Sequence, residues 1–509
     1  MKDENNLDEK GIVDKEPMKN ADSSQSNNEK LDNVSKKRRK FKLTSTISAS
    51  VVAVILCGAI LFNHIIYPKI GPDVESTTTS GKDPNIESTT ASKDDPSVPD
   101  INPLLDYIVS APSYPVMAQY SSDHNSDEYD AWRDGIKDQR KYYNAGGNLD
   151  DFFKKSTAAI LGDTTTENAI FSPINIYMTL AMIAETGSGN TRAQILNALD
   201  AENIEALREQ AMYVWNACYR DDGRTMSRLS SSLWLDESIK YNERTLSNKY
   251  YASVFRGDMG SEEYSKSYNE WLKRETGGLL DDMVGDKKFS KDTVMALVST
   301  LYFSTSWDTK FDETLTKKGI FHSPTGDVEC DYMSIQQSGW RYYYGEKFTA
   351  TERTLGSDGV MHLILPDEGV SINELLSNDE ALSFLAKPGF GVNSAHPRVE
   401  ITLPKFDISM EKNIISDLQE LGITDCFDGD KADFSEFFPE NNPVITEIQH
   451  GARLAVDEEG CVGASYVHVA YGGGWPPPEI VDFTLDRPFI VVVTSPDNLP
   501  LFIGIVNQP

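Results

Sequence analysis

The sequence has few of the residues and motifs that build metal, nucleotide or hydrolase sites. Its 509 residues include five cysteines without a CxxC motif, and its seven histidines never fall at metal-ligand spacing. The motifs GxGxxG, GxxxxGKS/T and GxSxG are absent as well. A secreted disulfide framework would use more cysteines at closer spacing. We therefore expect no metal, no cofactor and no catalytic nucleophile.

Positive charge is scarce and unevenly placed. The net charge is -31, and such an acidic protein is a poor partner for nucleic acid. The one basic run, Lys36 to Lys42, directly precedes residues 43–67, which contain no Asp, Glu, Lys or Arg. That length spans a bilayer, and the flanking charge predicts a cytoplasmic N-terminus. We expect a retained single-pass signal anchor in the cell membrane rather than a cleaved signal peptide, because no small-x-small cleavage site follows.

The apolar run separates parts of different composition. Residues 1–42 are polar and poor in aromatics, so a disordered cytoplasmic tail is expected. Residues 68–100 are rich in Ser, Thr, Asp and Pro and predict an extracellular stalk. Apolar periodicity starts near Ile101 and becomes dense after Leu149. A folded domain is therefore expected over 101–509.

Helical signals come first in this domain, and strand signals come later. Periodicity and capping residues predict helices over 149–161, 172–187 and 191–200. Apolar runs rich in β-branched residues predict strands further along. This order is typical of an α+β fold with a large, mostly antiparallel sheet system. The predicted strands are 294–304, 361–366, 399–409, 452–457, 489–495 and 501–506.

Seven segments of the domain form a series of motifs. Residues 171–199 contain Phe-Ser-Pro, a helix of small residues and Gly-x-Thr-x-x-Gln-Ile-Leu, and residues 297–311 contain Tyr-Phe-x-x-x-Trp-x-x-x-Phe. In order and spacing the segments resemble the serpin family over roughly 142–509, and residues 129–153 resemble the leader of bacterial serpins. The other five segments are 268–280, 404–435, 450–460, 486–493 and 500–509.

The resemblance implies a serpin fold with a large central sheet, further sheets, about nine helices and an exposed reactive loop. It also implies a monomeric suicide inhibitor of serine proteases, or of papain-like cysteine proteases, and not an enzyme. In this mechanism a protease cuts the loop and forms an acyl-enzyme. The cut loop then inserts into the central sheet and distorts the attached protease. With the expected anchor, this predicts a bacterial inhibitor held at the membrane with its serpin domain outside the cell.

The segment 461–471 can be examined for insertion from its residues alone. Neither of its two alternating sets carries a charge, the set that starts at Cys461 is small at its first positions, and no Pro occurs before Gly474. One face could therefore be buried in a sheet. An ordinary edge strand beside a loop is the alternative interpretation. By resemblance, the hinge of the loop comprises Glu458, Glu459, Gly460, Cys461, Val462, Gly463, Ala464 and Ser465.

The resemblance also locates the reactive bond. The usual seventeen positions, counted from Glu458, place it between Gly474 and Trp475, with Tyr471–Gly472 as the alternative. A glycine before the bond suits elastase-, subtilisin- or papain-like proteases, whereas Tyr471 suits chymotrypsin- or subtilisin-like enzymes. The alternative function is a non-inhibitory serpin-fold binding or chaperone protein.

A polar cluster is expected by resemblance to hold the central sheet closed. Its members would be Ser172, Asn175, Ser299 and His450. Ser299 stands where the family usually has Asn, which predicts a looser closure because buried polar groups must satisfy one another. Cys461 is interpreted either as a small apolar residue or as an exposed thiol whose oxidation would block insertion.

Overall fold

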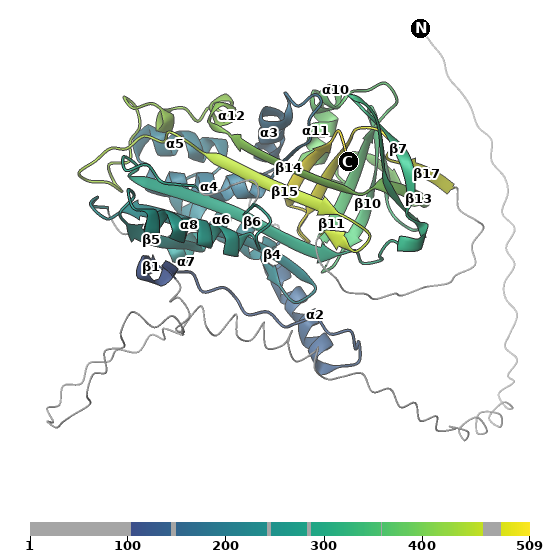
Figure 1. Cartoon of the computed structure of the whole chain (residues 1–509), viewed down its shortest axis with the longest axis horizontal. Coiled ribbons are helices and arrows are strands. Elements are labelled where there is room, and N and C mark those ends of the chain that lie inside the picture. Colours follow the sequence, from purple (N-terminus) through teal and green to yellow (C-terminus); the bar gives the residue numbers. More distant parts are fainter. Residues whose placement is uncertain (1–102, 144–148, 242–245, 282–286, 358, 462–479) are drawn as a thin grey trace, which may run out of the picture. The chain divides into compact units, whose positions relative to one another are not determined.

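Within the part that the structure describes, the chain folds into four β-sheets and ten α-helices (Figure 1). This arrangement confirms the predicted α+β class. The computed structural model describes residues 103–143, 149–241, 246–281, 287–357, 359–461 and 480–509.

The central sheet is mostly antiparallel. Its longest pairing joins β4 and β6 from Thr225↔Thr305 to Leu235↔Met295. Only β4 and β5 are parallel. The strands, in spatial order, are β1 (Ile108–Ser110), β5 (Ala252–Gly257), β4 (Thr225–Asp236), β6 (Met295–Ser306) and β16 (Gly460–Cys461), with β3 (Arg220–Asp221) paired to β4.

Three further sheets complete the β-structure. The second sheet holds much of the core, because every residue of β18 (Phe489–Thr494) and β19 (Pro500–Val506) is buried. Its remaining strands are β12 (Asn393–Ala395), β9 (Tyr342–Gly345), β10 (Phe348–Leu355), β11 (Gly359–Pro366) and β2 (Ala169–Phe171). The third sheet contains β17 (Ile480–Thr484), β13 (Arg398–Pro404), β8 (Gly326–Ser338) and β7 (Lys317–Ser323), and the fourth contains β14 (Phe406–Asn413) and β15 (Gln449–Val456).

Helix α4 (Pro173–Thr186) is the buried helix of the fold. Ser172 caps it by accepting a hydrogen bond from the Asn175 backbone N–H, and Pro173 fits the first turn. All its residues except Thr179 are buried, and the helix contacts both β6 and β19. The other helices are α2 (Asp127–Gln139), α3 (Asp150–Leu161), α5 (Gly189–Ala198), α6 (Ile204–Cys218), α7 (Leu246–Tyr250), α8 (Glu262–Glu275), α10 (Ile372–Leu376), α11 (Asp379–Ala386) and α12 (Ile415–Glu420).

One predicted element is wrong. The expected strand 399–409 is two strands in two different sheets, because β13 ends at Pro404 and β14 begins at Phe406. β13 pairs with β8, whereas β14 pairs with β15. The apolar side chains change phase at Pro404 and Lys405, from positions 399, 401 and 403 to positions 406 and 408. The prediction of one strand overlooked this break in the alternation.

The predicted membrane anchor, residues 43–67, lies outside the described residues, as do the tail 1–42 and the stalk 68–100. Within the described ranges, none of the helices combines the length and apolar character needed to cross a bilayer.

Candidate functional site

The central sheet ends on one side in a strand edge that is almost unpaired. β6 pairs with β4 along its length. On its other side, among the described residues, only Ser306 and Thr305 have partners, which are Gly460 and Cys461 of β16. β15 is paired with β14 alone, and among the described strands no backbone pairing joins β6 to β15. β15 leads through residues 457–459 into β16, which pairs with the end of β6. An unpaired edge of this kind can accept another strand.

The hinge leaves β15 directly beside this edge. Three backbone carbonyls, those of Asp457 and of the first two hinge residues, accept hydrogen bonds from the segment that follows β6. Trp307 donates its indole N–H to Asp457 at 2.8 Å and its backbone N–H to Glu459 at 3.0 Å, and the Phe311 backbone N–H reaches Glu458 at 3.2 Å. The end of β6 therefore positions the start of the loop.

The two hinge carboxylates are both neutralised. Lys405 lies 2.7 Å from Glu458, which also accepts a hydrogen bond from the Thr316 hydroxyl at 2.6 Å. Burial alone would raise the pKa of Glu458, but the hydrogen bonds from Lys405 and Thr316 hold it below its usual value. Glu459 pairs with Lys310. These contacts hold the first two hinge residues to β14, β7 and the segment that follows β6 through side chains at or next to those elements.

Gly460 and Cys461 form the only two strand pairs on the outer edge of β6 within the described chain. Gly460 has φ +154°, and a Cβ atom there would lie 2.3 Å from the carbonyl oxygen of Thr305. Cys461 is fully buried, and burial raises the pKa of its thiol well above the usual value. This burial agrees with the interpretation of Cys461 as a small apolar residue and not with the alternative of an exposed, oxidisable thiol.

Arg353 of β10 packs against Trp307 and Phe311, whose backbone N–H groups donate to the hinge carbonyls. Its guanidinium carbon is 4.6 Å from the Trp307 ring centroid and 4.2 Å from that of Phe311. The side chain is buried and donates to the Thr309 carbonyl, but its Nε and Nη1 have no hydrogen-bond partner among the described residues. Burial lowers the pKa of Arg353 to about 9, so it stays charged at neutral pH. The sequence analysis missed Arg353, whose only local signal is a cation between Thr351 and Leu355 on one strand face.

The four residues of the expected polar cluster meet at the first turn of α4. The Ser172 backbone N–H donates to His450 Nε2 at 3.1 Å, and the Asn175 amide donates to the Ser299 carbonyl at 3.0 Å. The Ser299 hydroxyl donates to the Asn175 carbonyl oxygen and accepts from Ser231 at 3.3 Å. Among the described side chains, Ser299 makes no hydrogen bond to His450. β6 and β15 are thus each tied to α4 but not to each other.

We expect the replacement Ser299→Asn to stabilise the uncut protein by about 1 kcal/mol, the usual net value of one hydrogen bond. The longer amide would reach toward His450 and link β6 to β15. Urea unfolding of the uncut protein measures the effect. Ser377→Asn, at the exposed C-cap of α10, is the matched control. An unchanged or lower unfolding midpoint in Ser299→Asn would contradict the explanation.

The remaining predicted site residues lie outside the described residues. These are Val462, Gly463, Ala464 and Ser465 of the hinge, and Tyr471, Gly472, Gly474 and Trp475 of the two candidate bonds. The chain leaves the described part at Cys461 and re-enters it at Ile480, the start of the edge strand β17. In the described parts of the chain, no cluster of His, Cys, Asp and Glu could hold a metal ion.

Comparison with known proteins connects this arrangement to one family. A family model described as "Serpin (serine protease inhibitor)" matches residues 149–509. Serpin-ZX of Arabidopsis thaliana is 29% identical over 366 residues, which cover 67% of this chain and 92% of that protein. Plasminogen activator inhibitor 1 of Sus scrofa is 26% identical over 381 residues, which cover 70% and 91%.

Solved structures agree with the sequence relatives. The thermophilic serpin Tengpin in its native state matches with a TM-score of 0.63 and 25% identity, covering 77% of this chain and 98% of that one. Human thyroxine-binding globulin in complex with its ligand matches with a TM-score of 0.62 and 20% identity, covering 72% and 99%. The second likeness concerns the fold alone.

Proposed function

Because the chain belongs to the serpin family, we propose that it traps serine proteases by inserting its cut reactive loop into the central sheet. The observation that supports this most directly is the unpaired edge of β6 beside the hinge. Residues 295–304 of β6 have no partner on that side within the described chain. The uncharged, proline-free segment 461–471 is of similar length. It could pair along this edge as a strand.

Insertion would continue a pairing that already exists. Gly460 and Cys461 pair with the last two residues of β6, Ser306 and Thr305, and the next residues of the loop would follow in the same antiparallel register. Each added residue would gain backbone hydrogen bonds and bury one side chain. The free energy released by completing the sheet is what would carry an attached protease along.

The target class follows from the loop sequence. Cleavage at Gly474–Trp475 favours elastase-, subtilisin- or papain-like proteases, and cleavage at Tyr471–Gly472 favours chymotrypsin- or subtilisin-like enzymes. A cut at Tyr471 would shorten the inserted strand and favour turnover of the inhibitor as a substrate. Human thyroxine-binding globulin shares the fold, so the fold by itself does not exclude a binding protein.

Incubation with a panel of these proteases tests the proposal. We expect a covalent complex that survives a denaturing gel, and mass analysis of the released C-terminal fragment to identify the bond. Cys461→Arg is the control. A charged side chain at this buried position beside β6 should prevent insertion, and therefore trapping, while the loop is still cleaved. Clean cleavage of the unaltered protein by every enzyme, without a complex, would instead indicate a non-inhibitory protein.

We also propose that residues 43–67 anchor a monomeric protein in a bacterial cell membrane with the serpin domain outside. The length of the apolar run and the basic residues before it support this placement. An inhibitor held there would protect neighbouring surface proteins. Recovery of the protein in the medium rather than in the membrane fraction would overturn the placement.

A further inference from the structure

The segment that precedes the family match is firmly docked on the domain. The leader, residues 103–143, has aromatic and hydrogen-bonding contacts with α6 and the start of β4. Tyr114 stacks on Trp215 and Tyr219 with ring centroids 5.6 and 5.7 Å apart. The Tyr120 backbone N–H donates to the Asp222 carbonyl at 2.7 Å. The leader therefore contacts the turn between β3 and β4.

A buried carboxylate receives the leader helix. Asp222 is fully buried, and its Oδ2 accepts the indole N–H of Trp132 on α2 at 2.9 Å. The same oxygen accepts the Ser357 hydroxyl at 2.7 Å, and Oδ1 accepts the backbone N–H of Thr225 at 2.8 Å. Arg220 Nη1 lies 3.6 Å away. A buried carboxylate depends on such donors, so loss of one leaves the charge under-satisfied.

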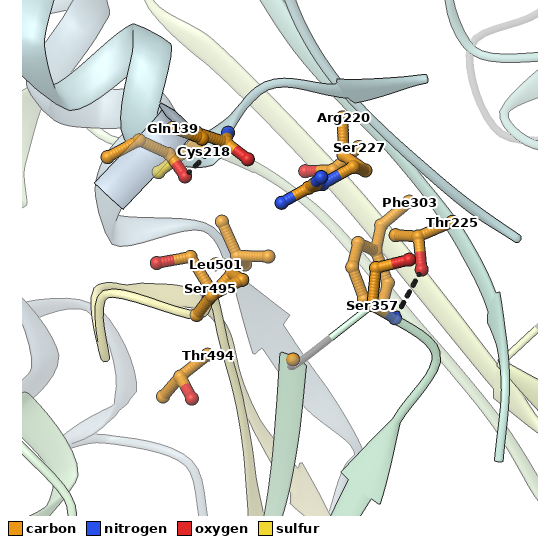
Figure 2. A pocket seen from close by; sticks show the side chains of 13 residues that line it. Gln139, Cys218, Arg220, Thr225, Ser227, Phe303, Ser357, Thr494, Ser495 and Leu501 are labelled. Carbon is orange, nitrogen blue, oxygen red and sulfur yellow. Dashed lines mark hydrogen bonds between the residues drawn. The ribbon is translucent and has the colours of Figure 1, made fainter. Parts of the chain in front are cut away.

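The hydrogen bonds continue from Asp222 to the seat of the hinge. The Ser357 backbone N–H donates to the Thr225 hydroxyl at 3.1 Å (Figure 2), and that hydroxyl lies 2.8 Å from the hydroxyl of Thr305. Thr305 is the residue that pairs with Cys461. All these residues are buried, and their polar groups form one interior network that includes the indole N–H of Trp132.

The turn between β10 and β11 packs closely against this network. A Cβ atom on Gly356 would lie 2.1 Å from the Thr305 hydroxyl and 2.3 Å from that of Thr225. Helix α2 has a second anchor nearby, since the Gln139 amide donates to the carbonyls of Asn216 at 2.8 Å and Tyr219 at 2.7 Å. Figure 2 shows Gln139 across a small cavity from Arg220. Hydrogen bonds and close packing therefore connect α2 to the start of β4 and the end of β6.

We propose that Trp132 and Asp222 are positioning residues for loop insertion, which rests on the proposed function. Through Ser357, Thr225 and Thr305, they hold the end of β6 in the geometry that seats Gly460 and Cys461. These two pairs are the nucleus from which the inserting strand grows. Because ordering each residue of a new strand costs conformational entropy, a preformed nucleus shortens the delay between cleavage and trapping. The leader thus raises the fraction of proteases that are trapped before deacylation.

The test measures the stoichiometry of inhibition, which is the number of inhibitor molecules consumed per protease trapped. Trp132→Phe keeps the ring and removes the indole N–H. We expect it to raise the stoichiometry roughly threefold or more, since hydrogen bonds to charged groups are among the stronger ones in proteins. The rate of loop cleavage should stay unchanged. Tyr129→Phe, one turn away on α2, is the matched control and should behave like the unaltered protein.

Ser357→Ala breaks the same network on the other side of Asp222 without touching the leader. If both residues act through Asp222, the stoichiometry of inhibition should rise less in the double variant than the product of the two single increases. Hydrogen exchange of the peptide 457–461 should rise in each variant. Normal stoichiometry in Trp132→Phe and Ser357→Ala, even with lowered thermal stability, would overturn the inference. Failure of the unaltered protein to form any complex would instead overturn the proposed function.

Discussion

Acidification from pH 7 to pH 4 is expected to remove several kcal/mol from the free energy of unfolding of the uncut protein. Burial lowers the pKa of His450 to about 4 and that of His362 to about 3. In the unfolded chain both titrate near 6.5, so the unfolded state binds protons first. Above about pH 6.5 both histidines are neutral in the folded and the unfolded state, and their burial costs no protonation energy. As the pH falls toward 4, the free energy of unfolding decreases by about 3 kcal/mol through His450.

Urea unfolding at pH 7, 6, 5 and 4 measures this loss. His450→Gln keeps a hydrogen-bond acceptor for the Ser172 backbone N–H and removes the titration, so its stability should vary less across this range. His396→Gln, at an exposed position, should leave the pH dependence unchanged. A pH profile of His450→Gln that matches the unaltered protein would show that the buried imidazole does not limit acid stability.

The replacement Gly460→Val is expected to destabilise the uncut protein by about 2–4 kcal/mol, because strained backbone and overpacking each cost this order of free energy. The new Cβ atom would meet the Thr305 carbonyl oxygen at 2.3 Å. After cleavage and insertion the same position would be ordinary strand, which valine favours. The variant should therefore melt earlier before loop cleavage but nearly normally after it.

Thermal unfolding before and after loop cleavage checks this expectation. Gly451→Val on β15 is the matched control, since the nearest atom to a Cβ there is Leu280 Cδ1 at 3.9 Å. It should melt close to the unaltered protein in both states. Equal losses for Gly460→Val before and after cleavage would mean that the hinge keeps its strained geometry on insertion.

Local patterns predicted the elements whose boundaries depend on local chemistry. The Ser172 cap and Pro173 located the start of α4, because both act within one helical turn. The error at 399–409 has a different cause. The apolar alternation shifts by one residue at Lys405, which marks the break, but it does not indicate that the two halves pair in different sheets.

The candidate site divides in the same way. The motifs that resemble serpins pointed to Ser299 and His450, which the structure places on either side of α4 without a bond between them. Neither motif nor period pointed to the bond between Trp132 and Asp222, or to that between Ser357 and Asp222. These pairs are separated by 90 and 135 residues along the chain. Contacts of such range depend on the packing of whole elements.

By itself the sequence determined that the stretch beginning at Cys461 can be buried as a strand, because lack of charge and alternation are properties of the residues themselves. Only the tertiary structure decided where that strand could go. Among the described strands, β15 pairs with β14 and not with β6, and most of the β6 edge beside the hinge is left open. The leader reaches the hinge through Asp222 because folding buries that carboxylate among donors from distant segments.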